Sequence, residues 1–341
     1  MQITKRQHYV PQKYLKAWSL GNDKIAMNNK GNIISSVDIS NVAQESYFYE
    51  FEDLTCDEFI FTVNYLNEKI KWPKDTIQKH LVMHLFSSLT KPIPNPETEK
   101  ILNYAISNQI FDKDMLTLLA QVKIGNAFSI PCLEEMNQKS KKEGEEDLNC
   151  MIEQAAWPHL ELALSGDISF FYTQDGFENF TLFLIYQMFR SKRFLEIFQK
   201  DTLHFGADGL RRISTYLRYP IVSLIHSNIV KKRNEFDILY IKNNTSLEFI
   251  SGDQPVANLD NNSSPIYFDL YYPISPTQAI LVTKCDRIKS IYDKFSDITI
   301  DDVDCLNKKI CDVSINQLYA TTEDIFRQKG YVAKAMFNPT I

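Results

Sequence analysis

His8-Tyr9-Val10-Pro11-Gln12-Lys13-Tyr14-Leu15 is an aromatic and apolar stretch close to the N-terminus, and Trp18 follows it within one helical turn. A free terminal segment carries mostly small polar residues, so this composition predicts that the terminus is tied into the body of the protein. Pro11 suits the first turn of a helix, where its missing N–H is not needed. Tyr14 and Trp18 would then share a buried face, with His8 just ahead of the helix as either a capping residue or a functional imidazole.

The composition provides enough apolar residues for a packed core. Of the 341 residues, 44% are hydrophobic and 12% are aromatic, which excludes wholesale disorder. Glycine is scarce (10), whereas phenylalanine and tyrosine are abundant (22 and 17), and this balance does not favour a glycine-rich nucleotide-binding sheet. The formal charge of −6 argues against a surface built for permanent DNA binding, although it leaves room for a local basic groove.

The cysteines and the N-terminal sequence bear on the cellular compartment. The six cysteines include no C-x-x-C pair, and a chain of this length without a signal peptide is not a disulfide scaffold. The first residues lack the apolar h-region of a signal peptide, and no uncharged run reaches the roughly 18 to 20 residues that span a bilayer. We therefore expect a soluble, cytoplasmic protein with no membrane association.

The order of the predicted elements indicates an α+β fold. Two short strands within residues 24–37 form a hairpin, and the apolar spacing then becomes helical. We expect a single domain over residues 1–341, with a helical middle at about 56–235. A mostly antiparallel sheet would form the mostly β portion at about 236–341, completed by the N-terminal segment 1–55.

The helical middle contains a charged run and a very apolar helix. The run at 138–147 predicts an exposed loop. Residues 177–198 form the apolar helix, and it carries Gln187, Arg190 and Arg193 along one row. A guanidinium in such a helix needs a carboxylate, a phosphate or several carbonyl groups. Arg190 therefore either pins the helix to a buried aspartate or, with Gln187, holds a phosphate or carboxylate of a ligand.

An apolar strand ends abruptly in a polar turn at Phe249-Ile250-Ser251-Gly252-Asp253-Gln254-Pro255. Asp253 follows the apolar residues directly, and a carboxylate at the end of a rigid strand is well placed for chemistry. The alternative is an Asx-turn, in which Asp253 hydrogen-bonds its own backbone.

Motifs of familiar enzyme classes are missing from the sequence. His80 and His84 have a spacing that a metal could use, but Leu81 stands where a zinc hydrolase has its glutamate. The chain has no P-loop, no G-x-G-x-x-G and no G-x-S-x-G, which excludes ordinary kinases, dinucleotide enzymes and serine hydrolases.

Five short motifs taken together resemble one family. They are H-Y-V-P-x-x-Y-L at 8–15, V-A-x-E-x-x-F-Y at 42–49, Q-x-x-R at 187–190, S-x-D-x-P-V at 251–256 and P-x-S-P at 273–276. Their order and spacing resemble the uncharacterised family named domain of unknown function 4238.

The resemblance implies a set of shared polar positions and no established activity. These positions are His8, Glu45, Gln187, Arg190, Asp253 and Asn307. If they converge, Glu45 and Asp253 would hold Mg²⁺ or Mn²⁺ through oxygen ligands, and His8 would act as a general acid or base. Arg190, oriented by Gln187, would steady the charge on phosphoryl oxygens.

This set predicts a nuclease-like phosphodiester hydrolase that acts on RNA or DNA, as a phage-defence effector. Tyr9 and Tyr49 would stack a base, and Arg193 and Asn307 would add ligand contacts. Two alternatives stay open: a sensor that binds a nucleotide or small anion without turnover, and a glycohydrolase that cleaves the glycosidic bond of a nucleotide. A homo-oligomer is a further open expectation.

Overall fold

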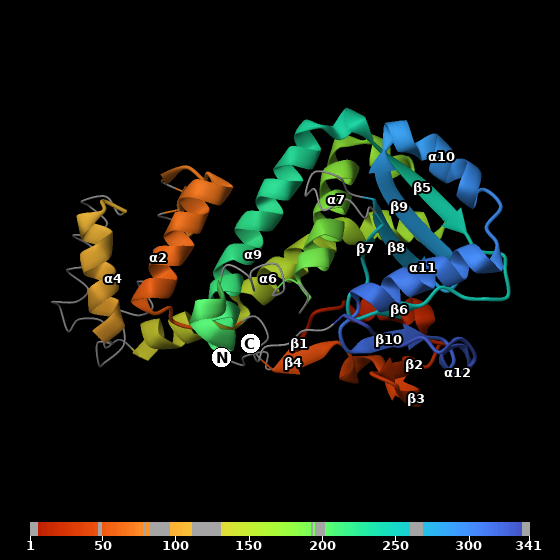
Figure 1. The fold of residues 1–341 in the computed structure, drawn as a ribbon, viewed down its shortest axis with the longest axis horizontal. Helices are drawn as coiled ribbons and strands as arrows, with labels where there is room; N and C mark the ends of the chain where they lie inside the picture. The colour runs from red at the N-terminus through yellow and green to blue at the C-terminus, as the bar shows by residue number, and fades with distance from the viewer. Residues whose placement is uncertain are drawn as a thin grey trace.

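A computed structural model provides the coordinates of the protein (Figure 1). The residues that it describes are 6–46, 50–74, 76–77, 80–81, 96–110, 131–191, 194, 202–259 and 269–335, with the backbone alone at 131–140, 143, 203, 289 and 294.

Helices dominate the middle of the chain and flank the sheets. The α-helices are α1 (Gln12–Leu15), α2 (Cys56–Asn64), α4 (Pro96–Ser107), α6 (Pro131–Leu164), α7 (Gln174–Phe189), α9 (Gly206–Lys231), α10 (Cys285–Phe295), α11 (Ile300–Val313) and α12 (Asp324–Lys329). The shorter turns are η1 (Lys16–Trp18), η2 (Ile39–Asn41), η3 (Tyr65–Ile70, a π-helix), η4 (Ser169–Tyr172), η5 (Leu203–Phe205) and η6 (Arg233–Glu235). Within the described residues, no helix is both long and apolar enough to cross a membrane.

The strands form three antiparallel sheets. They are β1 (Arg6–His8), β2 (Lys24–Asn29), β3 (Asn32–Asp38), β4 (Gln44–Ser46), β5 (Phe236–Lys242), β6 (Ser251–Gly252), β7 (Ala257–Asn258), β8 (Leu270–Ser275), β9 (Gln278–Lys284) and β10 (Gln317–Ala320). The strand orders are β1-β4, β3-β2-β10-β6 and β5-β9-β8-β7. Met27 of the N-terminal hairpin lies opposite Tyr319 of β10, so the two ends of the chain share one sheet. The predicted α+β class with an antiparallel C-terminal sheet is confirmed.

The elements are arranged as a helical region beside a β region (Figure 1). Helices α2 and α4 lie at the end of the molecule away from the sheets, and α6, α7 and α9 lie between them and the β region. Helix α7 packs against both α6 and α9, whereas α10 covers β5 and β9 and α11 contacts β6 and β7.

The N-terminal segment is buried between these regions, as its composition predicts. The Tyr14 ring stacks on Tyr272 with centroids 5.0 Å apart, and its hydroxyl donates to the carbonyl oxygen of Pro273 at 2.7 Å. The Trp18 indole N–H donates to the carbonyl oxygen of Phe249 at 3.0 Å. Fully burying a large apolar side chain contributes about 1.5–3 kcal/mol, so this short helix anchors the terminus firmly.

The prediction of a loop at 138–147 is wrong, because helix α6 runs without interruption through these residues. The lysine, glutamate and glutamine side chains of this run are strong helix formers, and Gly144 costs only about 1 kcal/mol. The run also finds partners, since Glu145 is 5% exposed and forms an ion pair with Arg218 of α9. This charged run therefore forms part of a helix, and one of its acidic side chains faces a basic group of α9.

Candidate functional site

A two-stranded ribbon places His8 next to the helical region. Strand β1 pairs with β4, with Gln7 opposite Glu45 and His8 opposite Gln44. The ribbon therefore brings His8 and Glu45 to neighbouring positions, although Glu45 is exposed. The amide of Gln7 donates to the carbonyl oxygen of Lys142 at 2.5 Å, which ties the ribbon to α6.

The hydrogen bonds of the His8 ring define its neutral tautomer. Its Nδ1 lies 3.2 Å from the carbonyl oxygen of Val42; because a carbonyl can only accept, Nδ1 carries the proton. The Nε2 lone pair then accepts the amide N–H of Gln12 at 2.8 Å. Burial lowers the pKa of His8 below 6.5, and the charge of Arg190 acts in the same direction. At neutral pH the ring is an uncharged base, and among the described residues its Nε2 lone pair meets the amide of the exposed Gln12.

Arg190 fixes the backbone at His8. It lies at the C-terminal end of α7 and is 2% exposed. Its guanidinium donates to the carbonyl oxygen of His8 and forms an ion pair with Glu153 of α6. Both partners predicted for a buried guanidinium, a carboxylate and a carbonyl, are thus present. In this arrangement Arg190 connects the ribbon, α6 and α7.

Helix α6 supplies acidic and thiol groups beside Arg190. Glu146, Cys150 and Glu153 stand at i, i+4 and i+7, so they share one helix face. Burial raises the pKa of Glu146 above 4.5, so its neutral form is favoured more than in water, and the amide of Asn149 donates to it at 3.3 Å. Burial also raises the pKa of the exposed Cys150 thiol, with the charges of Glu146 and Glu153 acting in the same direction. The face presents a carboxyl group with a raised pKa, a thiol with a raised pKa and an ion-paired carboxylate.

Two polar groups beneath this cluster are buried without partners. Gln187 is 0% exposed, and neither amide atom has a hydrogen-bond partner among the described residues. The hydroxyl of Tyr272 likewise has no hydrogen-bond partner among the described residues. Burial raises the pKa of this hydroxyl, while the charge of Glu153 raises it further and that of Arg190 lowers it. An unpaired buried polar group costs about 1–3 kcal/mol, and such groups are common where a ligand or an ordered water completes a site.

Asp253 makes a set of structural contacts. One carboxylate oxygen accepts the backbone N–H of Ile315 at 2.9 Å, and the other accepts those of Asn316 at 2.8 Å and Gln317 at 3.2 Å. The side chain therefore holds the turn between α11 and β10, and both of its oxygens are engaged. This is neither the Asx-turn nor the open strand-end carboxylate that the sequence suggests.

Other predicted site residues lie elsewhere. Asn307 accepts the backbone N–H of Ile250 at 3.0 Å and donates to the carbonyl oxygen of Glu248 at 2.8 Å, so it ties α11 to the chain before β6. Tyr9 is 4% exposed in the core. Tyr49 and Arg193 lie outside the described residues.

The described part of the chain holds no group of three or more histidine, cysteine or acidic side chains that could bind a metal ion. Glu45 and Asp253 accordingly do not join such a group there. His80 Nε2 bonds to the carbonyl oxygen of Tyr216 at 2.8 Å, while His84 lies outside the described residues.

The acidic side chains of α6 are the site residues that the sequence analysis missed. The signal was present, because Glu146, Cys150 and Glu153 follow helical spacing. It was hidden by the reading of 138–147 as a loop, which ended the helical pattern too early.

Fold and cluster together define an α+β protein with a mixed acid and base site where an N-terminal ribbon meets a helical layer. The model of the family described as protein of unknown function (DUF4238) matches residues 6–212, and the chain belongs to this family. The match includes the whole cluster from His8 to Arg190, whereas Asp253 and Asn307 follow it in the sequence. Neither the comparison with curated proteins nor the comparison with solved structures found a match.

Proposed function

We propose that the protein is a nuclease-like enzyme that cleaves the phosphodiester bonds of RNA by transesterification, with protons passing between its own side chains and the substrate. The observation that carries the proposal is the His8 imidazole, which is neutral, has its Nδ1 proton fixed on Val42 and its Nε2 lone pair near the surface. A positioned imidazole of this kind is suited to general base catalysis.

The choice of RNA follows from the groups that accompany His8. The 2′-hydroxyl of RNA is a nucleophile that a neutral imidazole can deprotonate directly. His8 Nε2 would take the 2′-hydroxyl proton while O2′ attacks the phosphorus atom. Glu146, whose pKa is raised by burial, would give a proton to the departing 5′-oxygen. The products would be a 2′,3′-cyclic phosphate and a 5′-hydroxyl end.

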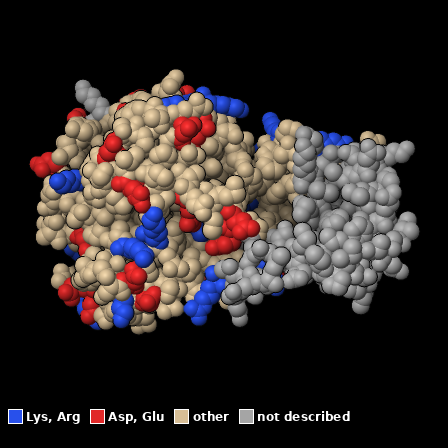
Figure 2. Space-filling model, turned by 180° about the vertical axis from the view of Figure 1, so that it is seen from behind, with Lys and Arg blue, Asp and Glu red and all other residues tan. Residues whose placement is uncertain are grey.

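Arg190 has a positioning role in this proposal. Its charge is already engaged by Glu153, and it holds the His8 backbone. Electrostatic attraction of the substrate falls instead to surface groups such as the exposed Arg6 on the same ribbon. On the face in Figure 2, lysine and arginine are interspersed with aspartate and glutamate over the described part of the chain. That pattern favours a short single-stranded segment over a long duplex.

The test is cleavage of a single-stranded RNA and its all-deoxy counterpart in the presence of EDTA. We expect cleavage of RNA alone, with a cyclic phosphate end detected by mass spectrometry. His8→Gln and Glu146→Gln should each lower the rate by about 10²–10⁴-fold. Asp147→Asn, which changes the exposed neighbouring carboxylate on α6, is the matched control and should keep the wild-type rate. Cleavage that needs a divalent cation, or that survives in both variants, would contradict this mechanism.

A second candidate is a nucleotide glycohydrolase, and the two carboxylates of α6 favour it. Glu153 is ion-paired with Arg190, whereas burial raises the pKa of Glu146. Two carboxyl groups in different environments are the usual equipment for glycosidic cleavage. Loss of the base from a nicotinamide dinucleotide with RNA left intact would select this function, and Glu153→Gln should then abolish it. Tight binding of a nucleotide that stays unchanged would instead indicate a sensor.

The biological setting that we propose for RNA cleavage is antiviral defence. It can be tested by comparing phage plaque counts on cells that carry the wild-type chain with those on cells that carry His8→Gln. Equal counts would remove the defence role and leave the enzymatic proposal to the cleavage assay.

A further inference from the structure

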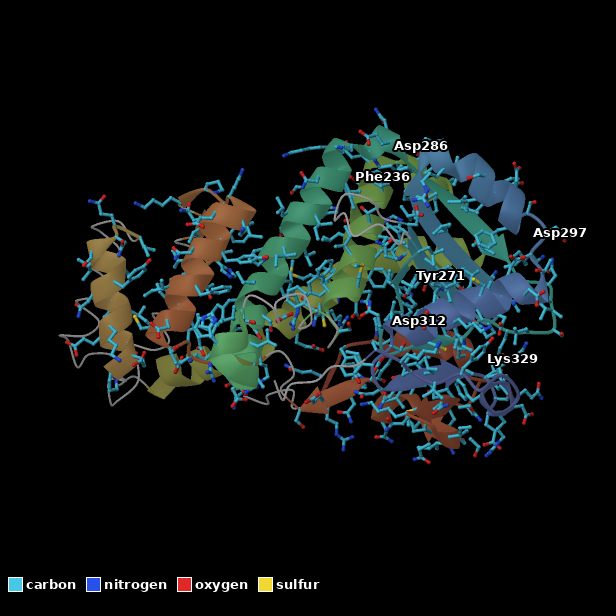
Figure 3. The ribbon with its side chains drawn as sticks, viewed as in Figure 1. Phe236, Tyr271, Asp286, Asp297, Asp312 and Lys329 are labelled. Carbon is cyan, nitrogen blue, oxygen red and sulfur yellow. The ribbon has the colours of Figure 1, made fainter. Side chains whose placement is uncertain are left out.

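A separate cavity lies away from the His8 cluster, where η4, α7 and the turn into β5 meet the start of α10. Its volume is about 340 Å³, which is in the range of small-molecule sites. Aromatic rings form much of its wall, including Phe171, Phe177 and Phe236. Figure 3 labels Phe236 at the beginning of β5 and Asp286 at the nearby beginning of α10.

Two opposite charges line this cavity without forming a pair. Arg233 donates to the carbonyl oxygen of Tyr172 at 2.6 Å, and its guanidinium carbon lies 5.5 Å from the centroid of the Phe177 ring. Asp237 accepts the Tyr172 hydroxyl at 2.9 Å and the backbone N–H of Ile238 at 2.8 Å, both on Oδ1. Within the described part of the chain, neither charge forms an ion pair, since the neighbouring Lys232 and Lys284 pair with Glu235 instead, and Oδ2 of Asp237 accepts no hydrogen bond there.

Opposite charges that share a cavity and remain unpaired are suited to a ligand that carries both signs. We propose that this cavity binds a small zwitterion with an aromatic body, the chemistry of a free aromatic α-amino acid. The ligand carboxylate lies on Arg233, its ammonium group on Oδ2 of Asp237, and its ring against Phe171 and Phe177. The guanidinium that holds the carboxylate is itself fixed by the Tyr172 carbonyl, so little ordering is needed on binding.

The other groups of the cavity fit binding better than chemistry. Burial raises the pKa of the Cys285 thiol, and the charge of Asp237 raises it further. The thiol points its proton at the carbonyl oxygen of Asn234, 3.6 Å away. A neutral thiol is a poor nucleophile. A mononucleotide fits less well, because its phosphate dianion would meet only one guanidinium and would lie near the Asp237 carboxylate.

The experiment is isothermal titration calorimetry on the full chain. L-Phenylalanine, L-tyrosine and L-tryptophan are compared with two half-ligands: 2-phenylethylamine, which lacks the carboxylate, and 3-phenylpropionate, which lacks the ammonium group. Guanosine and adenosine monophosphates form the nucleotide arm. We expect at least one amino acid to bind at least 10-fold more tightly than either half-ligand, and any heat from the nucleotides to be unaffected by substitutions in the cavity.

Variants then assign each charge. Asp237→Asn should weaken binding of the amino acid and of 2-phenylethylamine by at least 10-fold and leave binding of 3-phenylpropionate unchanged. Arg233→Gln should weaken binding of the amino acid and of 3-phenylpropionate by at least 10-fold and leave binding of 2-phenylethylamine unchanged. Asp286→Asn removes a nearby carboxylate that does not line the cavity and should change nothing. Thermal melting checks that each variant folds; if one does not, the half-ligand series on the wild-type chain still decides. No binding of any amino acid at millimolar concentration, nucleotide binding that Arg233→Gln abolishes, or amino acid affinities unchanged in both variants would overturn the proposal.

Discussion

The Asp253 side chain offers a sharp test of whether its role is structural. The carboxylate is 4% exposed and accepts three backbone N–H groups from the turn at Ile315, Asn316 and Gln317. The test is Asp253→Asn, which keeps the size of the side chain and replaces one acceptor oxygen with an NH₂ donor. That donor must face at least one backbone N–H.

The expected cost follows from the bonds that the amide cannot make. In its better orientation, asparagine keeps its oxygen on the two amides of Asn316 and Gln317 and sets its NH₂ against the N–H of Ile315. One charge-assisted hydrogen bond, worth about 1.5–3 kcal/mol, is lost, and a buried donor is left unpaired at about 1–3 kcal/mol. We expect the free energy of unfolding to fall by about 3 kcal/mol. For 341 residues, an unfolding entropy of about 2.1 cal/mol/K per residue converts this into a Tm lower by about 4 °C.

The assay combines urea unfolding with hydrogen exchange. The backbone amides at 315–317 should exchange faster in Asp253→Asn, while those of the β5–β9 pairing should not. Asp312→Asn is the control. Asp312 lies on α11 (Figure 3) and makes a half-exposed ion pair with Lys334 at 3.1 Å. Such a pair is worth at most about 1 kcal/mol. Unchanged stability together with lost activity would refute the structural role and return Asp253 to the site.

Three further outcomes are expected. Arg190→Met should lower the free energy of unfolding by about 2–4 kcal/mol, because it leaves Glu153 and a backbone carbonyl without their partner; unaltered urea unfolding would contradict this. Tyr14→Phe should cost about 1–2 kcal/mol through the lost hydroxyl bond to a buried carbonyl, and a midpoint shifted by less than the error would argue against the anchoring role. RNA cleavage should be fastest between the ordinary pKa values of Glu146 (4.5) and His8 (6.5). Burial raises the pKa of Glu146 and lowers that of His8, which enlarges the fraction of molecules that carry a protonated Glu146 and a neutral His8. The pH–rate profile checks this, and a rate that only rises into alkaline pH would exclude the pair.

The parts of the fold that the sequence predicts are those set by local patterns. Two short apolar segments on either side of an asparagine- and glycine-rich turn within 24–37 predict the hairpin, and the aromatic face of Tyr14 and Trp18 predicts a buried terminus. Both features follow from the spacing of neighbouring residues, so one sequence is enough to read them. Arg190 does have a carboxylate partner, but it is the partly exposed Glu153 of α6 and not the buried aspartate that was expected.

The misses share a physical cause, which is that the deciding partner lies far away in the chain. The charges at 138–147 are helical because Arg218 stands opposite Glu145, 73 positions further on. Asp253 is engaged by a turn more than 60 positions beyond it. A polar side chain has the same sequence signature whether it faces a ligand or a distant backbone, so sequence alone leaves both interpretations open.

The position of His8 depends on both halves of the molecule. Arg190 holds its carbonyl from the helical side, while Tyr14, six residues later, is fixed by Pro273 of the C-terminal sheet. Between these two anchors the backbone at His8 cannot shift without disturbing one of them, and the ring is held by Val42 and Gln12. Rigid support of this kind is what a general base needs, since misplacement by about 1 Å is enough to slow a reaction severely. The buried guanidinium and the buried phenol therefore contribute to the proposed chemistry through geometry, and neither needs to touch the substrate.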